Sequence, residues 1–296
     1  MKAGTAFTAD PAVFIAAARS PFSGRRKAEI YWRRSMLNWK QYKDRPLVAV
    51  HRGYHGGNIL PNTVESVRAA LAVADIAEID ISYVGGECFV YHDGEESRMF
   101  GFQTNLERLT PEAVRRLRYT NKYGCLIDHP VNTLDEILEA AAGGYVNIDR
   151  CWKSAEEVAA VVGIVKKHGM LDKAVFKSTV NFAGNFKDQP VEYLVIARSV
   201  DDIRRAEAIR PLTGAELLFT SADAAREMVA YCRQKGYLTW GNSLVLDDRT
   251  VLSAHLDDMG GLIDPDANWG ELYRLGFDVI QTDFPADVMR YFAHRH

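Results

Sequence analysis

The chain has 296 residues, of which 47% are hydrophobic and 25% are charged, and its formal net charge is −3. This composition is typical of a globular protein with an ample core, built as one large barrel or as two ordinary domains. The small net charge and the lack of a long basic block argue against a nucleic-acid partner. The 4 cysteines lie far apart and form no CxxC pair, so a zinc site and a disulfide framework are both disfavoured.

Residues 1–45 precede the first strand pattern. Their one apolar run, AVFIAAA, is too short for a secretory signal, and an acidic residue comes shortly before it. The basic and aromatic stretch that follows, RRKAEIYWRRSMLNWKQY, predicts a helical extension that packs on the barrel or on a partner chain. An interfacial membrane helix is the alternative, but acidic and polar residues break its apolar face.

Because no run approaches the roughly 20 apolar residues of a membrane span, we expect a soluble, cytoplasmic protein without stable membrane insertion. Assembly into a homo-oligomer stays open.

From Leu47 onward, short apolar runs alternate with amphipathic helical patterns, several of which end at glycine. The strand candidates are LVAVHRG, AEIDISYV, YVNID, AVFKS, YLVIARS, AELLFT, YLTWGNS and DVIQTDF. Helical crossovers between so many strands predict a parallel sheet, and a length of about 250 residues favours an α/β fold of the (β/α)8 TIM-barrel type over residues 46–296. No GxGxxG or GxxxxGK motif follows a strand, so nothing indicates a nucleotide-binding fold.

A further apolar run, CFVYH, is separated from the second strand only by the segment GGE. This connection is far too short for a parallel crossover, so the run must return as an antiparallel hairpin. At about 3.3 Å per residue along both arms, we expect His92 to lie level with Asp80. Residues 95–132 lack strand character and predict a small helical insertion, with a helix beginning at Thr110–Pro111.

Polar groups gather where the early strands end, in the motifs HRGYHGG, EID and FVYHDG. These motifs supply the histidines His51 and His92 and the carboxylates Glu78 and Asp80. The carboxyl ends of the strands line the active site of a (β/α)8 barrel. Two imidazoles can exchange a proton across a reacting phosphate, and carboxylates can hold a divalent cation on its oxygens. One histidine at a strand end is usually structural, but this combination suits phosphate-ester chemistry.

The segment from Val48 to Gly94 resembles the glycerophosphodiester phosphodiesterase family, part of the larger group of barrel-shaped phospholipase-C-like phosphodiesterases. YVNID, ending at Asp149, corresponds to the family strand that carries a third acidic metal ligand, and GFDVIQTDFP resembles the family's closing strand. The likeness extends over roughly residues 46–293. It implies a metal-dependent enzyme that hydrolyses a small soluble phosphodiester to a phosphomonoester and an alcohol.

The resemblance and the residue types together predict a metal site at Glu78, Asp80 and Asp149. Carboxylates brought together in a barrel repel one another, and a divalent cation with hard oxygen ligands relieves that repulsion. Mg²⁺ or Ca²⁺ fits such a site better than zinc does, and Mn²⁺ is acceptable. A salt bridge is the alternative for any one of these acids.

The resemblance also implies that His51 and His92 act as general acid and base, without assigning either role. Arg52 follows the family motif, and its guanidinium should bind a phosphate oxygen. The family usually has a lysine two residues after the third acid, where this chain has Cys151. Lys177, at the end of the next strand, is a candidate for supplying that charge to the phosphate, and a surface lysine is the alternative.

Several departures from the family affect the alcohol side of the substrate. The chain has LPNT where the family commonly has PENT, Asp149 is shorter than the usual glutamate, and His55 with Gly56–Gly57 enlarges and polarises the first loop. Trp240 corresponds to a family tryptophan and is expected, with Asn242 beside it, either to stack on a glycerol or sugar at the barrel mouth or to pack in the core. Other aromatic residues whose direction the sequence does not fix are Tyr54, Phe182, Phe186 and Trp269.

Three substrates or reactions remain open. Glycerophosphodiesters are the family default, and a sugar phosphodiester of the agrocinopine (opine) type is the first alternative, because the altered loop and mouth aromatics could favour sugars. The second alternative is a sphingomyelinase-D-like lyase that releases a cyclic phosphate. Relatives of that kind have a disulfide near the site, and Cys88 has no evident partner.

Overall fold

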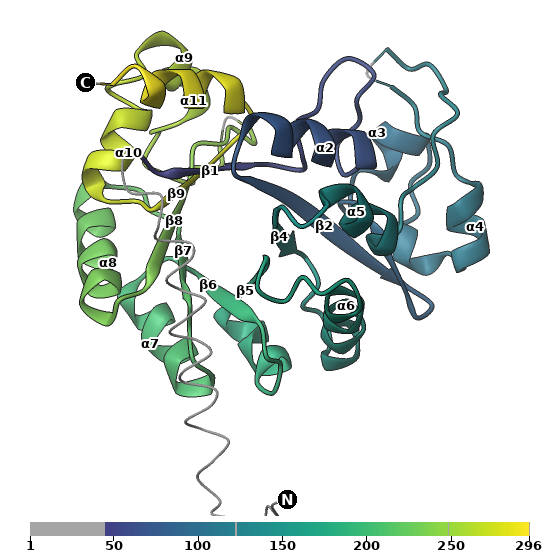
Figure 1. Cartoon of the computed structure of the whole chain (residues 1–296), viewed down its shortest axis with the longest axis horizontal. Coiled ribbons are helices and arrows are strands. Elements are labelled where there is room, and N and C mark those ends of the chain that lie inside the picture. Colours follow the sequence, from purple (N-terminus) through teal and green to yellow (C-terminus); the bar gives the residue numbers. More distant parts are fainter. Residues whose placement is uncertain (1–44, 122, 248, 296) are drawn as a thin grey trace, which may run out of the picture.

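The computed structural model describes residues 45–121, 123–247 and 249–295, so the helical extension expected for residues 1–45 lies almost wholly outside the described part. Within these ranges, parallel strands close into a ring in the order β1-β9-β8-β7-β6-β5-β4-β2, with β1 pairing back to β2 (Figure 1). The predicted (β/α)8 barrel is confirmed. Its strands are β1 (Leu47–Val50), β2 (Ile76–Val84), β4 (Tyr145–Asp149), β5 (Ala174–Thr179), β6 (Glu192–Ala197), β7 (Gly214–Leu217), β8 (Leu238–Asn242) and β9 (Val279–Thr282).

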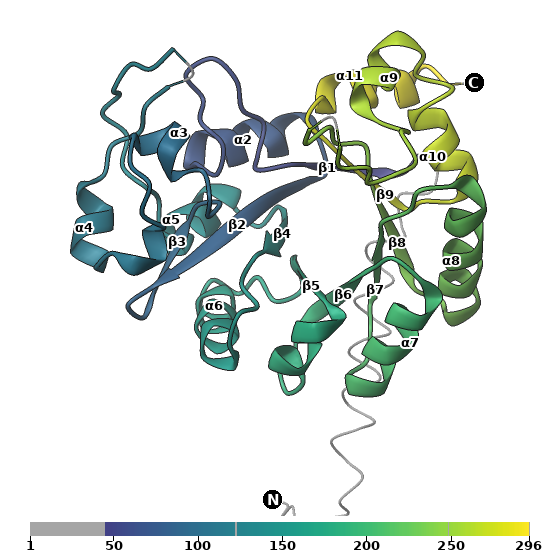
Figure 2. The ribbon, with the colours of Figure 1, turned by 180° about the vertical axis from the view of Figure 1, so that it is seen from behind.

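Helices surround the ring, as the views from the front and from behind show (Figures 1 and 2). They are α2 (Val64–Val73), α5 (Leu134–Ala141), α6 (Ala155–Lys167), the 3-10 helix η2 (Val180–Phe186), α7 (Val200–Ile209), α8 (Ala222–Lys235), α9 (Asp258–Ile263), α10 (Trp269–Leu275) and α11 (Pro285–Ala293). Most begin at a serine or threonine that accepts a backbone N–H of the first turn, as Thr63 does for α2 and Ser221 for α8. The sequence pattern missed η2, because the crossover from β5 to β6 is a short 3-10 helix without amphipathic repeats.

The strand β3 (Glu87–Val90) lies outside the ring and pairs antiparallel with the projecting end of β2, as predicted. Only Gly85 and Gly86 form the turn, with φ of +55° and +92°. A two-residue turn of this kind needs left-handed backbone at both positions, which glycine adopts without steric cost.

The register of this hairpin differs from the expected one by a single residue. Ile81 pairs with Val90, and the backbone N–H of Tyr91 donates to the carbonyl of Asp80 at 3.0 Å, so His92 is one position beyond Asp80. The reason is that Glu87, taken as part of the turn, belongs to β3 and shortens the turn.

The predicted insertion follows β3 and contains α3 (Glu96–Phe100), the 3-10 helix η1 (Leu106–Arg108) and α4 (Pro111–Arg116). The helix expected at Thr110–Pro111 begins there, with the Thr110 hydroxyl accepting the N–H of Ala113. The insertion packs with the hairpin around an apolar cluster separate from the barrel's two clusters. Its buried members are Leu60, Val84, Phe89, Tyr91, Met99, Leu106, Val114, Tyr119 and Val131.

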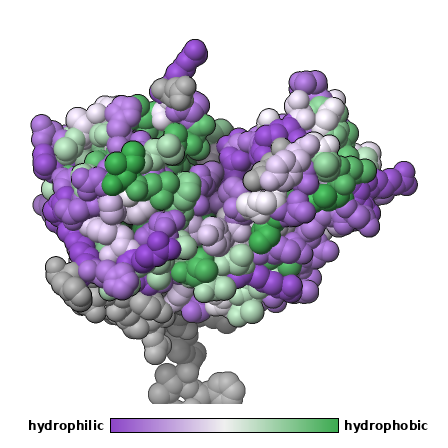
Figure 3. Space-filling model, turned by 90° about the horizontal axis from the view of Figure 1, so that it is seen from above, coloured by the Kyte–Doolittle hydropathy of each residue, from purple (hydrophilic) through white to green (hydrophobic). Residues whose placement is uncertain are grey.

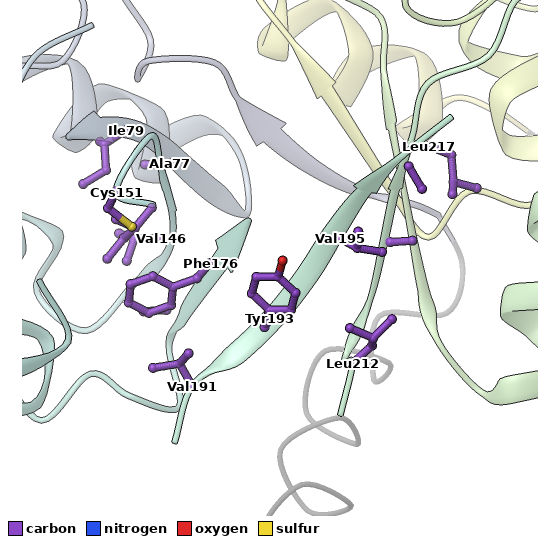
Figure 4. Packing of buried hydrophobic residues seen from close by; sticks show 14 of the residues in the cluster. Ala77, Ile79, Val146, Cys151, Phe176, Val191, Tyr193, Val195, Leu212 and Leu217 are labelled. Atoms are coloured by element: carbon purple, nitrogen blue, oxygen red, sulfur yellow. The ribbon is translucent and has the colours of Figure 1, made fainter. Parts of the chain in front are cut away.

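Alternation along the strands divides the barrel residues into two sets. The outward set packs against the helices, and Figure 4 shows part of this cluster, including Ile79, Val146 and Phe176. The inward set fills the lower barrel with Leu47, Ala49, Ile76, Val175, Leu194, Leu238, Trp240 and Val279. Two residues further along these strands, the same inward face brings polar side chains toward the carboxyl end.

No helix within the described ranges is long and apolar enough to cross a membrane. The face seen in Figure 3 shows small apolar areas separated by hydrophilic ones. On α9, Met259, Leu262 and Ile263 are 58%, 46% and 85% exposed.

Candidate active site

His51 directly follows β1 and is fixed by its backbone and by its ring. Its N–H donates to the carbonyl of Thr282 at 3.2 Å, and its Nδ1 lies 2.9 Å from Oδ1 of Asp283. Burial lowers the pKa of His51, but the hydrogen bond to Asp283 and the charges of Glu78 and Asp283 outweigh it, so the pKa is raised. Burial raises the pKa of Asp283, and His51 more than reverses this. The pair therefore favours a protonated imidazole.

Arg52 connects the first loop to both acids of β2. Its backbone is left-handed (φ 54°), and its N–H donates to Oε2 of Glu78 at 2.7 Å. Its guanidinium Nε lies 3.4 Å from Oδ2 of Asp80, and Nη1 lies 3.3 Å from Oε1 of Glu95. The arginine of the HRG motif is thus brought to the predicted metal ligands, with a side chain that is 13% exposed.

Gly53 completes the motif for a steric reason. Its φ is +73°, and a Cβ at this position would lie 2.4 Å from Oγ of Ser66 and 2.7 Å from that residue's backbone carbon. The loop can pack against the first turn of α2 only with glycine here. This close packing holds His51 and Arg52 at the barrel end.

Asp80 is oriented by Asn62, which sequence reasoning did not single out. The Asn62 Nδ2 donates to Oδ2 of Asp80 at 2.9 Å, and the Asp80 N–H donates to Oδ1 of Asn62 at 3.0 Å. Asn62 is itself left-handed, with φ 61°. The asparagine of LPNT could have been chosen as a candidate, since it follows the first loop and is one of the few residue types that adopt this backbone readily.

His92 comes from the hairpin rather than from the ring. Its Nδ1 is buried without a hydrogen-bond partner among the residues that the structure describes. Burial lowers the pKa of His92, Asp80 opposes this, and the charges of Arg52 and Arg150 lower it further. The structure therefore brings both predicted histidines to the acids and moves their pKa values in opposite directions.

The acids Glu78, Asp80 and Asp149 are crowded with too little positive charge. Burial and then the charge of Asp80 raise the pKa of Glu78 to about 8. Burial raises the pKa of Asp149 to about 7, with Glu216 and Asp80 adding to the shift and Lys177 opposing it. Asp149 also accepts the N–H of Arg150 at 2.7 Å.

The donor set fits a hard divalent cation, although its present arrangement is not that of a formed metal site. Within the described ranges, no three His, Cys, Asp or Glu side chains are arranged to hold a metal ion as they stand. Burial, and then neighbouring carboxylates, nevertheless raise the pKa values of Glu78 and Asp149, so their ionised oxygens lack a sufficient cation. Such oxygens are the preferred ligands of Mg²⁺ and Ca²⁺.

Lys177 does not have the position expected of a phosphate ligand. Its side chain is 1% exposed, and its Nζ donates to Oε2 of Glu216 at 2.5 Å and to Oε1 of Gln281 at 3.1 Å. The expectation overlooked Glu216, an inward-facing acid on β7 that follows the same alternation as the other site residues. Because Glu216 neutralises its charge, Lys177 stabilises the barrel interior beside the acids.

Of the two alternatives for Trp240, the structure shows core packing, and Asn242 beside it is also an interior residue. Trp240 is 0% exposed, donates from Nε1 to Gln281 at 2.9 Å, and has the Lys177 Nζ 4.1 Å from its ring centroid. Asn242 is 3% exposed and donates from Nδ2 to Oε1 of Glu216 at 2.8 Å. Both residues face inward on β8, where the barrel is filled by side chains, so neither offers a surface to a substrate.

The other aromatic candidates differ in exposure. Phe186 and Trp269 are buried, whereas Phe182 is 37% exposed and stacks on Trp152, with centroids 6.3 Å apart. These two rings follow β5 and β4 at their carboxyl ends. His55, by contrast, is partly buried and directs Nδ1 to the carbonyl of Gly53 at 2.9 Å, so it closes its own loop in this structure.

Comparisons with known proteins give a fold but no function. A family model described as DUF4996, a domain of unknown function, matches residues 197–292. No curated protein matches the chain. Similar solved structures include a glycerophosphoryl diester phosphodiesterase from Parabacteroides distasonis, with 17% identity, TM-score 0.67, and 87% of this chain and 90% of that chain covered.

Two further solved structures support the same fold. A glycerophosphodiester phosphodiesterase from Thermotoga maritima has 22% identity and TM-score 0.60, with 84% of this chain and 98% of that chain covered. One from Agrobacterium tumefaciens has 17% identity and TM-score 0.62, with 82% and 99% covered. The chain therefore has the barrel fold of solved glycerophosphodiester phosphodiesterases.

Proposed function

We propose that the protein is a metal-dependent phosphodiesterase that hydrolyses a small phosphodiester to a phosphomonoester and an alcohol. The observation that carries this proposal is the meeting of two histidines, with pKa values displaced in opposite directions, and three crowded acids at one end of the barrel. Pairs of titratable groups displaced in this way are typical of general acid–base sites. The fold shared with solved phosphodiesterases supports the reaction class.

The directions of the pKa shifts favour one distribution of the two proton-transfer roles that the sequence left open. His51, whose pKa is raised and whose ring is held by Asp283, is the general acid and donates a proton to the departing alcohol oxygen. His92, whose pKa is lowered, is the general base and accepts a proton from the attacking water or hydroxyl. Each role is worth about 10²–10⁴ in rate.

Glu78, Asp80 and Asp149 would hold the cation, Mg²⁺, Ca²⁺ or Mn²⁺. When bound, such an ion neutralises charge on a phosphate oxygen and polarises the phosphorus centre. Without added positive charge these acids would repel an anionic diester, which is a physical reason to expect a cation here. Arg52, whose Nε lies 3.4 Å from Oδ2 of Asp80, orients that acid, and in this proposal its guanidinium binds a phosphate oxygen.

The alcohol part of the substrate is a glycerol derivative or a sugar. Burial of Trp240 removes one argument for a sugar, but the exposed ring of Phe182, stacked on Trp152 beyond the carboxyl ends of β5 and β4, supplies another. A flat aromatic face binds the apolar face of a sugar ring and adds little for a flexible glycerol. An agrocinopine-type sugar diester is therefore the second candidate substrate.

The test is hydrolysis of three diesters followed by phosphorus NMR: glycerophosphocholine, a sugar phosphodiester and bis(p-nitrophenyl) phosphate. We expect a phosphomonoester product, loss of activity with a chelator and recovery with Mg²⁺, Mn²⁺ or Ca²⁺. His51→Ala and His92→Ala should each lower kcat by about 10²–10⁴ without changing the Tm. His168→Ala, which removes a histidine paired with Asp135 on the outer helices, is the matched control.

Full activity after exhaustive chelation would exclude the metal mechanism. A cyclic phosphate product would identify the lyase alternative instead. Turnover of none of the diesters, in protein that folds and binds the metal, would reject the proposed reaction class.

A further inference from the structure

Arg150 leaves the barrel strand in an unusual backbone conformation beside the site. It follows Asp149 with a φ of 57°, a left-handed value that residues with a side chain rarely adopt. Its N–H donates to Oδ1 of Asp149 at 2.7 Å, which holds the turn. After this turn the chain enters the helix-facing core, where Cys151 is fully buried among apolar residues (Figure 4). Arg150 therefore lies on the site side of the turn, and Cys151 does not.

The guanidinium of Arg150 bridges the end of β4 to the end of the hairpin. Its Nε lies 2.7 Å and its Nη2 lies 2.5 Å from Oδ1 of Asp93, the residue after His92. Lys153 takes the other carboxylate oxygen of Asp93 at 3.1 Å. In the part of the chain that the structure describes, Nη1 of Arg150 has no protein partner. The side chain is 32% exposed, so this edge of the fork is accessible.

The electrostatic surroundings of Arg150 are those of the site itself. Burial lowers its pKa, but Asp93, Asp80 and Asp149 more than compensate. The charges of Arg52 and Arg150 both lower the pKa of His92. Two guanidinium groups thus lie within electrostatic range of one histidine. The buried, unpartnered Nδ1 of that histidine is a further unsatisfied polar atom at the same place.

We propose that Arg150 binds a non-bridging oxygen of the substrate phosphate together with Arg52, using the edge of its guanidinium that Asp93 leaves open. This inference rests on the proposed phosphodiesterase function and names a residue for it that the sequence motifs did not mark. A planar fork held by one carboxylate is preorganised for a second anion, because little side-chain freedom remains to be lost. Asp93 is then a positioning residue, and it also competes with the phosphate for the same cation.

The experiment measures binding of inorganic phosphate to the full chain by titration calorimetry, at fixed Mg²⁺, alongside hydrolysis of bis(p-nitrophenyl) phosphate. Arg150→Gln should raise the Kd for phosphate about 10- to 100-fold and raise KM similarly. Arg150→Lys should recover only part of this, since a lysine binds as a point charge. Both substitutes are unbranched, so neither adds backbone strain at this position. Lys153→Gln, which removes the other cation on Asp93, is the matched control and should change the Kd less than twofold.

Asp93→Asn separates a substrate contact from a structural one. If Arg150 binds phosphate, this variant removes both a competing carboxylate and the group that holds the fork, so the Kd should rise much less than in Arg150→Gln, or fall. A Kd for phosphate that is unchanged in Arg150→Gln overturns the proposal. So does a Kd that rises equally in Asp93→Asn and Arg150→Gln, since the ion pair itself would then be what matters. If phosphate binding depends on Arg150 but the protein hydrolyses no diester, the anion site is supported and the proposed reaction is rejected.

Discussion

Replacing Asp283 by asparagine tests the assignment of His51 as the general acid. The substitution keeps the shape of the side chain and removes the negative charge 2.9 Å from the His51 Nδ1. His51 and Asp283 are 14% and 32% exposed, so solvent screens the interaction only in part. The variant loses both Asp283 contributions that raise the pKa of His51 and keeps burial, which lowers it, with the smaller opposing charges of Glu78 and Arg52. The imidazole should therefore lose its proton at a lower pH.

The expected size follows from the type of bond that is lost. A hydrogen bond to a charged group contributes about 1.5–3 kcal/mol. If the protonated imidazole is the reactive form, this corresponds to a fall in kcat of about 10- to 100-fold at pH 8, because 1.36 kcal/mol is a factor of ten in rate. The loss should become smaller as the pH is lowered, because a larger fraction of the variant then carries the proton.

The assay is the pH profile of kcat/KM for bis(p-nitrophenyl) phosphate, read together with an NMR titration of the histidines. In Asp283→Asn the descending, high-pH side of the profile should move to lower pH. Asp287→Asn, which removes an exposed partner of Arg290 on α11, is the control and should leave the profile unchanged. If the ascending side moves instead, His51 is the base and the two proton-transfer roles are reversed. An unchanged profile would mean that Asp283 does not set the protonation of His51.

Two more outcomes follow from the buried charges. The pKa values of Glu78 and Asp149 are raised to about 8 and about 7, so in metal-free protein their contribution to stability is complete below pH 4 and is lost as the pH rises to 8. Urea unfolding of chelated protein should therefore give a lower free energy of unfolding at pH 8 than at pH 5.5. Mg²⁺ at 100 times its Kd should add about 2.7 kcal/mol to that free energy. A free energy of unfolding that does not vary with pH would contradict the crowding of these acids. Lys177→Met leaves Glu216 buried without its cation and should cost about 3–5 kcal/mol of stability, most of which the double variant with Glu216→Gln should recover. Unchanged unfolding of Lys177→Met together with lost phosphate binding would restore Lys177 as a phosphate ligand.

The alternation of strand residues made much of the site predictable. Side chains alternate between the two faces of a strand, so once a barrel is inferred, every second residue from a buried inward-facing one also faces inward. This rule predicts that Glu78 and Asp80 lie on one face of β2. The same rule, applied to β7 and β9, would have found Glu216 and Gln281, the partners of Lys177. Glu216 lies outside the quoted family motifs, and Gln281 stands in the closing-strand motif GFDVIQTDFP as an uncharged residue that nothing in the motif distinguishes.

What the sequence could not provide is height within the barrel and the details of turns. Trp240 comes two residues after inward-facing Leu238, and His51 comes two residues after inward-facing Ala49. The Trp240 ring is nevertheless enclosed by the lower barrel, whereas the His51 ring reaches the open end. The difference depends on how the strands are staggered, which periodicity does not reveal. Likewise, the position of His92 depended on whether Glu87 belonged to the turn or to β3.

The separate apolar cluster beneath the hairpin has a consequence for how the molecule opens. His92 is carried by a unit, roughly residues 84–131, most of whose buried side chains form a cluster distinct from those of the barrel, whereas Cys88 and Val90 of β3 pack in the main barrel cluster. Segments with their own small core exchange their amide hydrogens in cooperative units below the global free energy of unfolding. Hydrogen exchange should therefore show this unit opening first, with Asp80 and the ring strands still protected. On heating, activity should disappear several degrees before the barrel melts, because His92, the proposed general base, moves away with the hairpin while the acids remain in place.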